Sequence, residues 1–326
     1  MRLEEVEAPH PEDGQVRVRV GATSCNFADV LLCRGRYQQR PSLPFTPGLE
    51  TCGVIDEVAS GEASSLLGTR VVGNPILPHG GFAEYAILDA EKVYAVPPEI
   101  PGEVAATLHL TYLSAWLGLH RRAHLAAGDV VAVTAAAGGV GSAAVQVAVA
   151  AGAEVIAIVS GPEKAQTAAA LGAHHVVDRS RDDVLETVRS IAPRGVDIVF
   201  DTAGGDAYDV ATKYIAFEGR IVVVGFASGT IPQPKLSHAF VKNYTISGLH
   251  WSLYGDHRPD LVRRAQAEIF DLVRSANIAP QISTVAGIGS VPDALQDLAD
   301  GRTQGKIVMA EQRSSLDGFL RTTLHR

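Results

Sequence analysis

A glycine-containing turn between an apolar strand and a helix of small residues is the segment of this chain best suited to chemistry. Residues 130–134 form a short apolar run, residues 135–141 read AAAGGVG, and residues 141–151 predict a helix. Gly138 lets the backbone approach a pyrophosphate, and Gly141 lets the helix pack closely on the strand. The helix directs its free N-terminal amides and the positive end of its dipole toward phosphate oxygens. The expected phosphate contacts are Ala137, Gly138, Gly139 and Val140.

The context of this turn separates a dinucleotide site from an ordinary tight turn. Ala136 stands where the first glycine of the GxGxxG pattern would stand, so the motif alone fits a small-residue turn in any α/β fold. However, a strand precedes the turn, a helix follows it, Gly152 ends that helix, and residues 154–159 form a second strand. This order favours a bound dinucleotide, and dinucleotides usually serve hydride transfer.

Residues after the second and third strands indicate which dinucleotide binds. An enzyme that uses NAD usually has an acidic residue at the end of the second strand, where it binds the ribose 2′-hydroxyl. Here that strand ends at Ser160, Lys164 follows on the next helix, and Arg179 follows the third strand. A hydroxyl and two cations suit a 2′-phosphate dianion, which favours NADPH. The alternative is that Lys164 and Arg179 are solvated surface charges. The acidic Glu163, next to Lys164, is a mild conflict with the NADPH assignment.

The elements that must position these residues fall into two kinds. Residues 1–107 are rich in short strands, such as the alternating QVRVRV at 15–20, and are interrupted by Pro and Gly, which is typical of an irregular antiparallel barrel. From residue 108 strands and helices alternate, which predicts βαβ units and a doubly wound parallel sheet. We therefore predict three segments: a barrel-like domain at 1–107, a dinucleotide-binding domain at 108–253 and a return to the first domain at 254–326.

Composition and charge exclude several classes of protein. The chain has 326 residues, 46% hydrophobic and 20% charged, and a net charge of −8 argues against nucleic-acid binding. No window approaches the ~18 consecutive apolar residues of a membrane span, and the acidic start MRLEEVEAPHPEDG is unlike a signal peptide. Three cysteines without a CxxC motif favour reduced thiols and a cytoplasmic protein.

Several segments together carry a family resemblance. They are NFADVLLCRGRY (26–37), PFTPGLETCGVI (44–55), the turn at 135–141, VDIVFDTAGG (196–205), GRIVVVGFASG (219–229) and GKIVM (305–309). In this order the chain resembles the zinc-free quinone oxidoreductases of the medium-chain dehydrogenase/reductase superfamily, the zeta-crystallin-like branch. The resemblance implies a GroES-like β-barrel catalytic domain joined to a Rossmann domain. Family members usually carry one more strand before the LEEVEAP segment, and the sequence leaves open whether the start codon is misassigned or an edge strand is lost.

The resemblance also implies further cofactor contacts. Tyr37 matches a tyrosine near the nicotinamide, Ser114 matches the hydroxyl residue of an LTAY-like segment, and Arg179 matches a position facing the 2′-phosphate. The remaining matches are Gly225, Phe226 and Ala227 after the fifth strand, His250 and Trp251 on the nicotinamide side, and Lys306 in the C-terminal GK turn. For Phe226 and Trp251, packing in the core is an equally good interpretation.

The positions that hold zinc in relatives lack zinc ligands here. Asn26 stands for the cysteine of a CxxD-like segment and Leu49 for the histidine of GHE, and neither is a good zinc ligand. The histidines at 79, 109, 120 and 124 are scattered, so we interpret each as a surface or internally satisfied side chain. A site at Cys25, one residue away, would need a second ligand nearby that the sequence does not offer. We expect no metal.

A site without a Lewis acid disfavours alcohol oxidation, which needs alkoxide stabilisation. It favours acceptors that take hydride readily, so the main prediction is an NADPH:quinone oxidoreductase. We expect Asn26 and Tyr37 to orient the acceptor oxygen, with the final proton from water and no general base assigned. The alternative for Asn26 is an amide that only holds its loop.

Two other functions remain open, and one assembly is implied. An enone, alkenal or enoyl-thioester reductase would use the same fold, since the fold does not fix the acceptor. A non-catalytic NADPH-binding protein, structural or regulatory, is the alternative from another class. The resemblance implies a homodimer in which dinucleotide-binding domains join edge to edge through a strand at 245–251.

Overall fold

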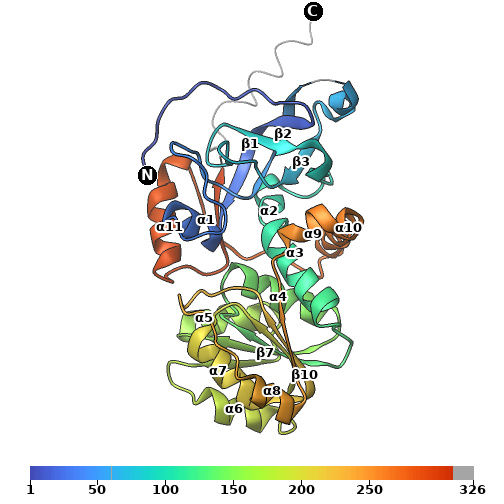
Figure 1. Ribbon diagram of the computed structural model, residues 1–326, viewed down its shortest axis with the longest axis vertical. Coiled ribbons are helices and arrows are strands. Elements are labelled where there is room, and N and C mark those ends of the chain that lie inside the picture. The colour runs from blue at the N-terminus through green and yellow to red at the C-terminus, as the bar shows by residue number, and fades with distance from the viewer. Residues whose placement is uncertain (60, 311–326) are drawn as a thin grey trace, which may run out of the picture.

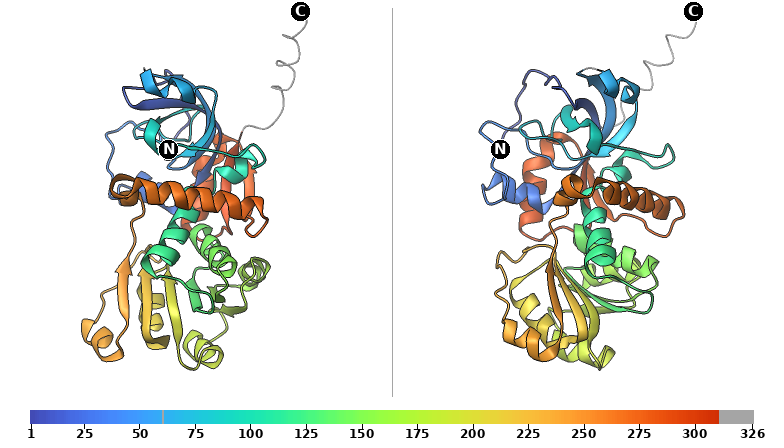
Figure 2. Two further views of the ribbon diagram at one scale, coloured as in Figure 1. Left: turned by 90° about the vertical axis from the view of Figure 1, so that its right-hand side faces the viewer. Right: turned by 45° about the vertical axis from the view of Figure 1, so that its right-hand side comes forward.

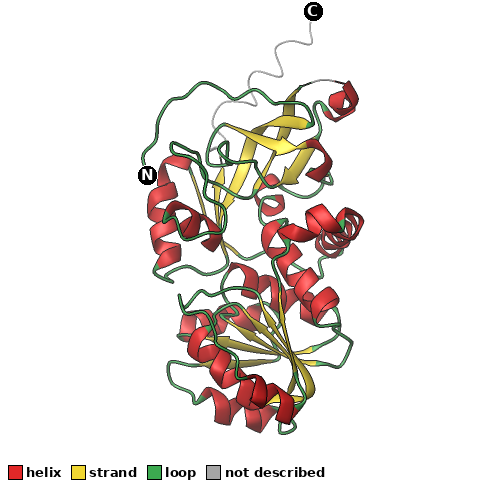
Figure 3. Cartoon of the chain, in the orientation of Figure 1, coloured by secondary structure: helices red, strands yellow, loops and turns green. Residues whose placement is uncertain are grey.

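The computed structural model describes residues 1–59 and 61–310, and these residues fold around two β-sheets, one above the other in Figure 1. The last part of the predicted third segment, residues 311–326, lies outside the described residues. Figure 3 shows the upper sheet with few helices and the lower sheet with helices on both faces. The two sheets correspond to the change in sequence pattern near residue 108.

The upper sheet combines the two ends of the described chain. Its seven strands, within the described residues, are β1 (Gln15–Cys25), β2 (Thr51–Val58), β3 (Arg70–Gly73), β4 (Tyr85–Asp89), β5 (Tyr94–Ala95), β12 (Ile282–Ala286) and β13 (Lys306–Ala310). β1 pairs antiparallel with β2, β4 and β13. The C-terminal helix α11 (Val291–Ala299) lies beside α1 (Phe27–Cys33) in Figure 1. The sheet is therefore complete only when the C-terminal segment returns to it.

Strand β1 follows its alternating sequence and then extends beyond it. Val16 and Val18 are fully buried, as the QVRVRV pattern predicts. The expected strand ended at residue 20, whereas β1 continues to Cys25 because Ala22–Cys25 pairs with β13. That pairing joins residues almost 290 positions apart, so local pattern could not reveal it.

The lower sheet is parallel throughout. Its six strands in the described part of the chain are β6 (Val130–Thr134), β7 (Glu154–Val159), β8 (His175–Asp178), β9 (Val196–Asp201), β10 (Ile215–Val223) and β11 (Thr245–Gly248). Their order is β11-β10-β9-β6-β7-β8, so the strand order reverses between β6 and β9. In open α/β sheets, ligands bind at the carboxyl ends of the strands beside this reversal. The predicted doubly wound sheet is confirmed.

Helices cover both faces of this sheet, which explains its nearly continuous apolar strands. Val131, Val155 and Phe200 pack in one cluster with helices α3, α4 and α10, whereas Ala132 and Ile156 pack on the other face with α6 and α7. The helices not yet given bounds are α2 (Gly102–Ala105), α3 (Leu110–Trp116), α4 (Gly139–Ala150), α5 (Pro162–Ala170), α6 (Val184–Ile191), α7 (Gly205–Tyr214), α8 (Leu236–Lys242), α9 (Ser252–His257) and α10 (Pro259–Arg274).

Helices that lie between the two sheets connect them. α3 continues into a π-helical segment (Leu117–Arg122), and Figure 2 shows α10 crossing between the upper and lower parts. One core cluster contains Cys52 and Val72 of the upper sheet together with Val131 and Phe200 of the lower sheet. This shared core fixes the two walls of the space between the sheets. Among the described residues, no helix is both long and apolar enough to cross a bilayer.

Candidate active site

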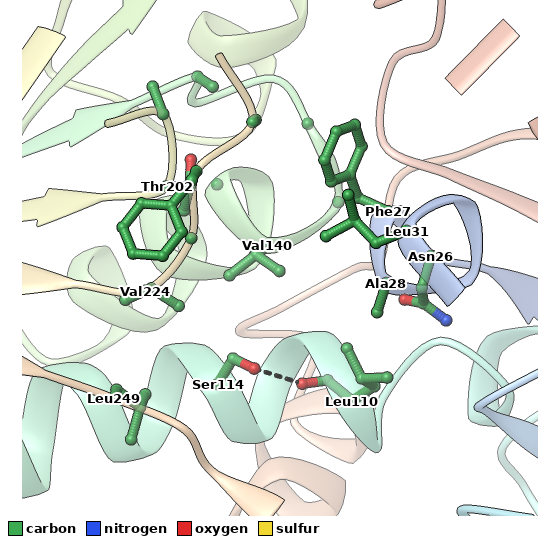
Figure 4. A pocket seen from close by; sticks show the side chains of 18 of the residues that line it. Asn26, Phe27, Ala28, Leu31, Leu110, Ser114, Val140, Thr202, Val224 and Leu249 are labelled. Carbon is green, nitrogen blue, oxygen red and sulfur yellow. Dashed lines mark hydrogen bonds between the residues drawn. The ribbon is translucent and has the colours of Figure 1, made fainter. Parts of the chain in front are cut away.

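A cavity of about 1790 Å³ lies between the two sheets, at the carboxyl ends of β6, β9 and β10. It is lined by every residue predicted for the site except Lys306. Figure 4 shows Phe27, Ala28 and Leu31 of α1 on one side of the cavity, and Val140, Val224 and Leu249 on the other. We call this cavity the cleft. Its two walls come from the two sheets, so a ligand in it contacts both.

The glycine turn between β6 and α4 has the shape that a pyrophosphate needs. A Cβ on Gly141 would lie 2.3 Å from the carbonyl oxygen of Ala135, so only glycine allows α4 to begin this close to the turn. The first amides of α4, from Gly139 onward, have no partner within the helix. Ala137, Gly138, Gly139 and Val140 all line the cleft. The turn therefore offers free N–H donors and a helix N-terminus to an anion.

A buried carboxylate organises the corner predicted to hold the 2′-phosphate. Asp178, at the end of β8, accepts hydrogen bonds from the amide of Gly161 (2.7 Å) and from the hydroxyl of Ser180 (2.7 Å). The Gly161 bond is the main reason that the pKa of Asp178 is lowered. These bonds tie the segment after β7, which carries Ser160 and leads to Lys164, to the segment that carries Arg179. Ser160, Lys164 and Arg179 all line the cleft.

The two cations at this corner differ in their contacts. The Lys164 ammonium donates to the carbonyl of Gly301 at 2.7 Å, which links α5 to the loop before β13. The Arg179 side chain is exposed and, among the described residues, has no recorded hydrogen bond or ion pair of its guanidinium. Arg179 is therefore available to an anion, while Lys164 must exchange its carbonyl partner to reach one.

Segments after β10 and β11 line the middle of the cleft, and the cofactor contacts predicted there stay predictions. Gly225, Phe226 and Ala227 follow β10 and line the cleft, and Phe226 is 38% exposed, so the core-packing interpretation of Phe226 is wrong. His250 and Trp251 follow β11 and also line it, although Trp251 additionally packs against the core.

Ser114 lies on α3 in the cleft wall. Its hydroxyl donates to the carbonyl of Leu110 at 2.8 Å, as the dashed line in Figure 4 shows.

Asn26, one of the two residues at the zinc positions of relatives, belongs to a buried ion-pair network with Lys306 and Glu50. The Lys306 ammonium donates to the amide oxygen of Asn26 at 2.5 Å and lies 3.1 Å from a carboxylate oxygen of Glu50. The Lys306 and Glu50 side chains are only 3% and 0% exposed. Glu50 also accepts from the Ser24 hydroxyl and the Leu110 amide, each at 2.7 Å. In the described part of the chain no group of three His, Cys, Asp or Glu residues could hold a metal ion.

This network changes the interpretation of two predicted residues. Lys306 was expected to contact the cofactor; it is not among the residues that line the cleft, and its ammonium donates to Asn26 and Glu50. The Asn26 amide nitrogen donates to the carbonyl of Ser24 (3.1 Å) and to Glu50 (3.3 Å). Asn26 is therefore engaged on both ends of its amide, which favours the alternative in which it holds its loop.

Asp29 and Tyr37 lie on the upper-sheet side of the cleft, and of the two only Tyr37 lines it. Asp29 is fully buried and accepts from the amides of Asn26 (2.9 Å) and Leu49 (3.0 Å). Burial raises the pKa of Asp29 to about 7. Tyr37 lines the cleft, and within residues 1–59 and 61–310 no hydrogen bond is recorded for its hydroxyl. Of the two residues predicted to orient an acceptor, Tyr37 is the one with a free polar group.

Sequence reasoning missed one part of the cleft. His109, interpreted as a bland histidine, is 2% exposed and lines the cleft beside Tyr94 and Trp251. Thr202, in the segment after β9, lines it as well. The position of Thr202 after a central strand was a usable signal, since ligands bind at strand ends. No local signal marked His109, because its neighbours come from distant segments.

A GroES-like barrel joined to a Rossmann domain, with a cleft between them, defines the class of medium-chain dehydrogenases and reductases. Residues 12–98 match the alcohol dehydrogenase GroES-like domain, and residues 139–267 match the domain described as zinc-binding dehydrogenase. The name describes the domain family as a whole. In this chain Asn26 and Leu49 still stand at the positions where relatives hold zinc.

Individual relatives indicate which branch of this superfamily the chain belongs to. The chain is 36% identical to the quinone oxidoreductase-like protein 2 of Bos taurus over 310 residues, which covers 94% of this chain and 88% of that protein. Among solved structures, Escherichia coli quinone oxidoreductase complexed with NADPH aligns with a TM-score of 0.86 at 27% identity over 95% of each chain. A mycobacterial protein complexed with NADPH aligns with a TM-score of 0.87 at 29% identity over 94% of each chain. The chain belongs to the quinone oxidoreductase branch of the medium-chain dehydrogenase/reductase superfamily.

Proposed function

We propose that this protein is a zinc-independent NADPH:quinone oxidoreductase that transfers hydride within the cleft. The observation that carries the proposal is the cleft itself, with a phosphate-binding turn on one wall and, on the other, Asn26 and Leu49 at the positions where relatives hold zinc. The relatives complexed with NADPH support the choice of cofactor.

The described residues fit an extended dinucleotide. The turn at 137–140 would hold the pyrophosphate through amide donors, and Ser160, Lys164 and Arg179 would hold the 2′-phosphate. The nicotinamide end would lie against the middle of the cleft. Its proposed contacts there are Tyr37, Ser114, Gly225, Phe226, Ala227, His250 and Trp251.

In this proposal the protein positions the acceptor beside the nicotinamide and excludes water, and no metal takes part. Bound NADPH supplies the hydride, and the cleft places an acceptor beside it, with the apolar side chains of Phe27 and Leu31 excluding water. The Tyr37 hydroxyl orients the acceptor oxygen, and Asn26, fixed by Lys306 and Glu50, holds the end of α1 in place. A proton from water completes the reduction of a quinone to a hydroquinone.

A second acceptor class has its own support. Ile76 and Leu77 add an apolar stretch to the cleft wall, which suits the chain of an alkenal or an enoyl thioester. Steady-state rates with 1,4-benzoquinone, 9,10-phenanthrenequinone, an alkenal and crotonyl-CoA distinguish the two classes. We expect the quinones to give the higher kcat/KM. If no acceptor raises NADPH oxidation above the uncatalysed rate, the non-catalytic alternative replaces the proposal.

We also propose that the protein is a cytoplasmic homodimer. In each subunit the domain boundaries would follow residues 107 and 253. All three cysteines are free, which suits a reducing compartment. Strand β11 is at the edge of the lower sheet, and the adjacent helix α8 exposes Leu236, Phe240 and Val241 by 72–83%. An exposed edge with apolar side chains is suited to pairing with a second copy. Light scattering should give twice the chain mass for the wild type and a lower mass for Phe240→Glu.

A further inference from the structure

The acceptor side of the cleft contains a histidine that the proposed mechanism does not use. His109 immediately precedes α3 and is enclosed by three other elements. Its ring centroid lies 5.1 Å from that of Tyr94 and 5.1 Å from that of Trp251, with the Trp251 ring at 89° to it. All three rings line the cleft. They form what we call the aromatic wall, a surface suited to a planar ring.

The His109 ring is held at one nitrogen and open at the other. Nδ1 lies 2.8 Å from the Gln266 side-chain oxygen, which can only accept, so Nδ1 carries the proton. The enclosed side-chain atoms without a partner, among the described residues, are Asp201 Oδ2, Tyr208 OH and Gln266 Nε2. His109 Nε2 also has no recorded partner there but is not one of these enclosed atoms. Since His109 lines the cleft, Nε2 opens onto it.

Gln266 can support either proton position on this ring. An amide ends in an oxygen and an NH2 group of similar size, so half a turn about its last bond exchanges acceptor for donors. In the described orientation Nδ1–H donates to Gln266, and Nε2 presents a lone pair to the cleft. In the other orientation the amide NH2 would donate to Nδ1, and Nε2 would present an N–H. The Gln266 nitrogen has no partner among the described residues, so the exchange breaks only the bond between Nδ1 and the Gln266 oxygen.

The ring is also uncharged under ordinary conditions. Burial lowers the pKa of His109, and this exceeds the opposing effects of Gln266 and Glu50. A neutral imidazole with either tautomer available matches both members of a quinone couple. The quinone oxygen only accepts a hydrogen bond, whereas the hydroquinone hydroxyl can donate one.

We propose that His109 is an acceptor-binding residue whose Nε2 contacts an oxygen of the quinone and, after reduction, of the hydroquinone. The change of tautomer between them gives one ring proton to water in the cleft and takes one back at the other nitrogen, so the ring stays neutral, and Gln266 accepts from or donates to Nδ1 accordingly. The aromatic wall holds the ring of the ligand flat beside this nitrogen. Lys92 and Asp256 also line the cleft and form an exposed ion pair at 2.8 Å. This inference rests on the proposed function, because it assumes that a quinone occupies the cleft.

The test is direct binding, supported by kinetics. Duroquinone and its hydroquinone are titrated by calorimetry, without oxygen, into protein saturated with NADP⁺; the fully methylated ring prevents addition to the exposed Cys33. His109→Phe keeps a flat ring and removes both nitrogens. We expect it to weaken both ligands by roughly 3- to 10-fold, the value of one neutral hydrogen bond. The Kd of NADPH should stay within about twofold, because Nε2 contacts the acceptor and the flat ring of Phe can still pack on Trp251.

Matched variants keep the test decisive. His120→Phe changes a histidine that packs on Trp116 outside the cleft and should alter neither ligand. Gln266→Met keeps the shape of a buried side chain, removes the partner of Nδ1 and should give a smaller loss in the same direction, even if His109→Phe folds poorly. Unchanged binding of both ligands to His109→Phe and Gln266→Met overturns the inference, and so does an equal loss of NADPH affinity. A wild-type protein that reduces no quinone refutes the proposed function instead.

Discussion

The buried pair between Lys306 and Glu50 gives the sharpest prediction on stability. The Lys306 ammonium and the Glu50 carboxylate are 3.1 Å apart, and both side chains are almost completely buried. Lys306→Met removes the cation and leaves the carboxylate in the interior without its counter-charge. Removing one partner of a buried pair costs about 3–5 kcal/mol. Because Ser24 and Leu110 still donate to Glu50, we expect about 3 kcal/mol, the lower end of that range.

A double-substitution cycle separates the pair from its surroundings. Glu50→Gln alone should also destabilise, whereas Lys306→Met with Glu50→Gln should recover much of the loss, since a neutral replacement of a buried pair is often tolerated. Lys92→Met is the control, because it breaks an exposed pair with Asp256 that should contribute about 1 kcal/mol or less. The measurement is urea unfolding followed by the fluorescence of Trp116 and Trp251.

One outcome would refute this reasoning. Lys306 does not line the cleft, so Lys306→Met should leave the Kd of NADPH within about threefold of wild type while the free energy of unfolding falls. If stability is unchanged and NADPH affinity drops tenfold or more, Lys306 binds the cofactor, and the network is not the structural element described here.

Three further predictions test the cleft. Gly141→Ala should weaken NADPH binding at least roughly 10-fold, since its Cβ would lie 2.3 Å from the Ala135 oxygen, whereas Gly102→Ala, with open space around it, should bind normally in the same titration. Lys164→Met should raise the Kd of NADPH by roughly 10-fold and leave that of NADH unchanged; an equal loss for both would remove the 2′-phosphate assignment. The raised pKa of Asp29, about 7 against an ordinary 3.8, means that the folded protein keeps a proton that the unfolded chain releases. Its contribution to stability is therefore present below about pH 4 and is lost as pH rises toward 7, so Asp29→Asn should flatten the pH dependence of urea unfolding across that range; an unaltered slope would contradict it.

The dinucleotide-binding half could be predicted because its signals are local. The apolar run of β6, the glycines of the turn and the small residues of α4 lie within about twenty consecutive residues, and each follows from backbone geometry or burial. The strand β7 has the predicted bounds for the same reason. Position after a strand was enough to place Ser160 and Arg179 in the cleft.

The side of the cleft formed by the upper sheet could not be predicted in the same way, because segments far apart in the sequence form it. The bond between Lys306 and Asn26 joins residues 280 positions apart, and nothing near either residue in the sequence indicates its partner. His109 depends on Gln266, 157 positions away, for its orientation. A buried histidine and a surface histidine look alike in sequence, and only packing distinguishes them.

The most direct test of the central claim is anaerobic oxidation of NADPH by a quinone after the protein has been dialysed against a strong chelator. The absorbance of reduced nicotinamide is followed with duroquinone, using protein shown by elemental analysis to be free of zinc. The account predicts saturable oxidation, faster with NADPH than with NADH and unchanged when Zn²⁺ is added back. Oxidation no faster than in buffer, or activity that returns only with Zn²⁺, would contradict it.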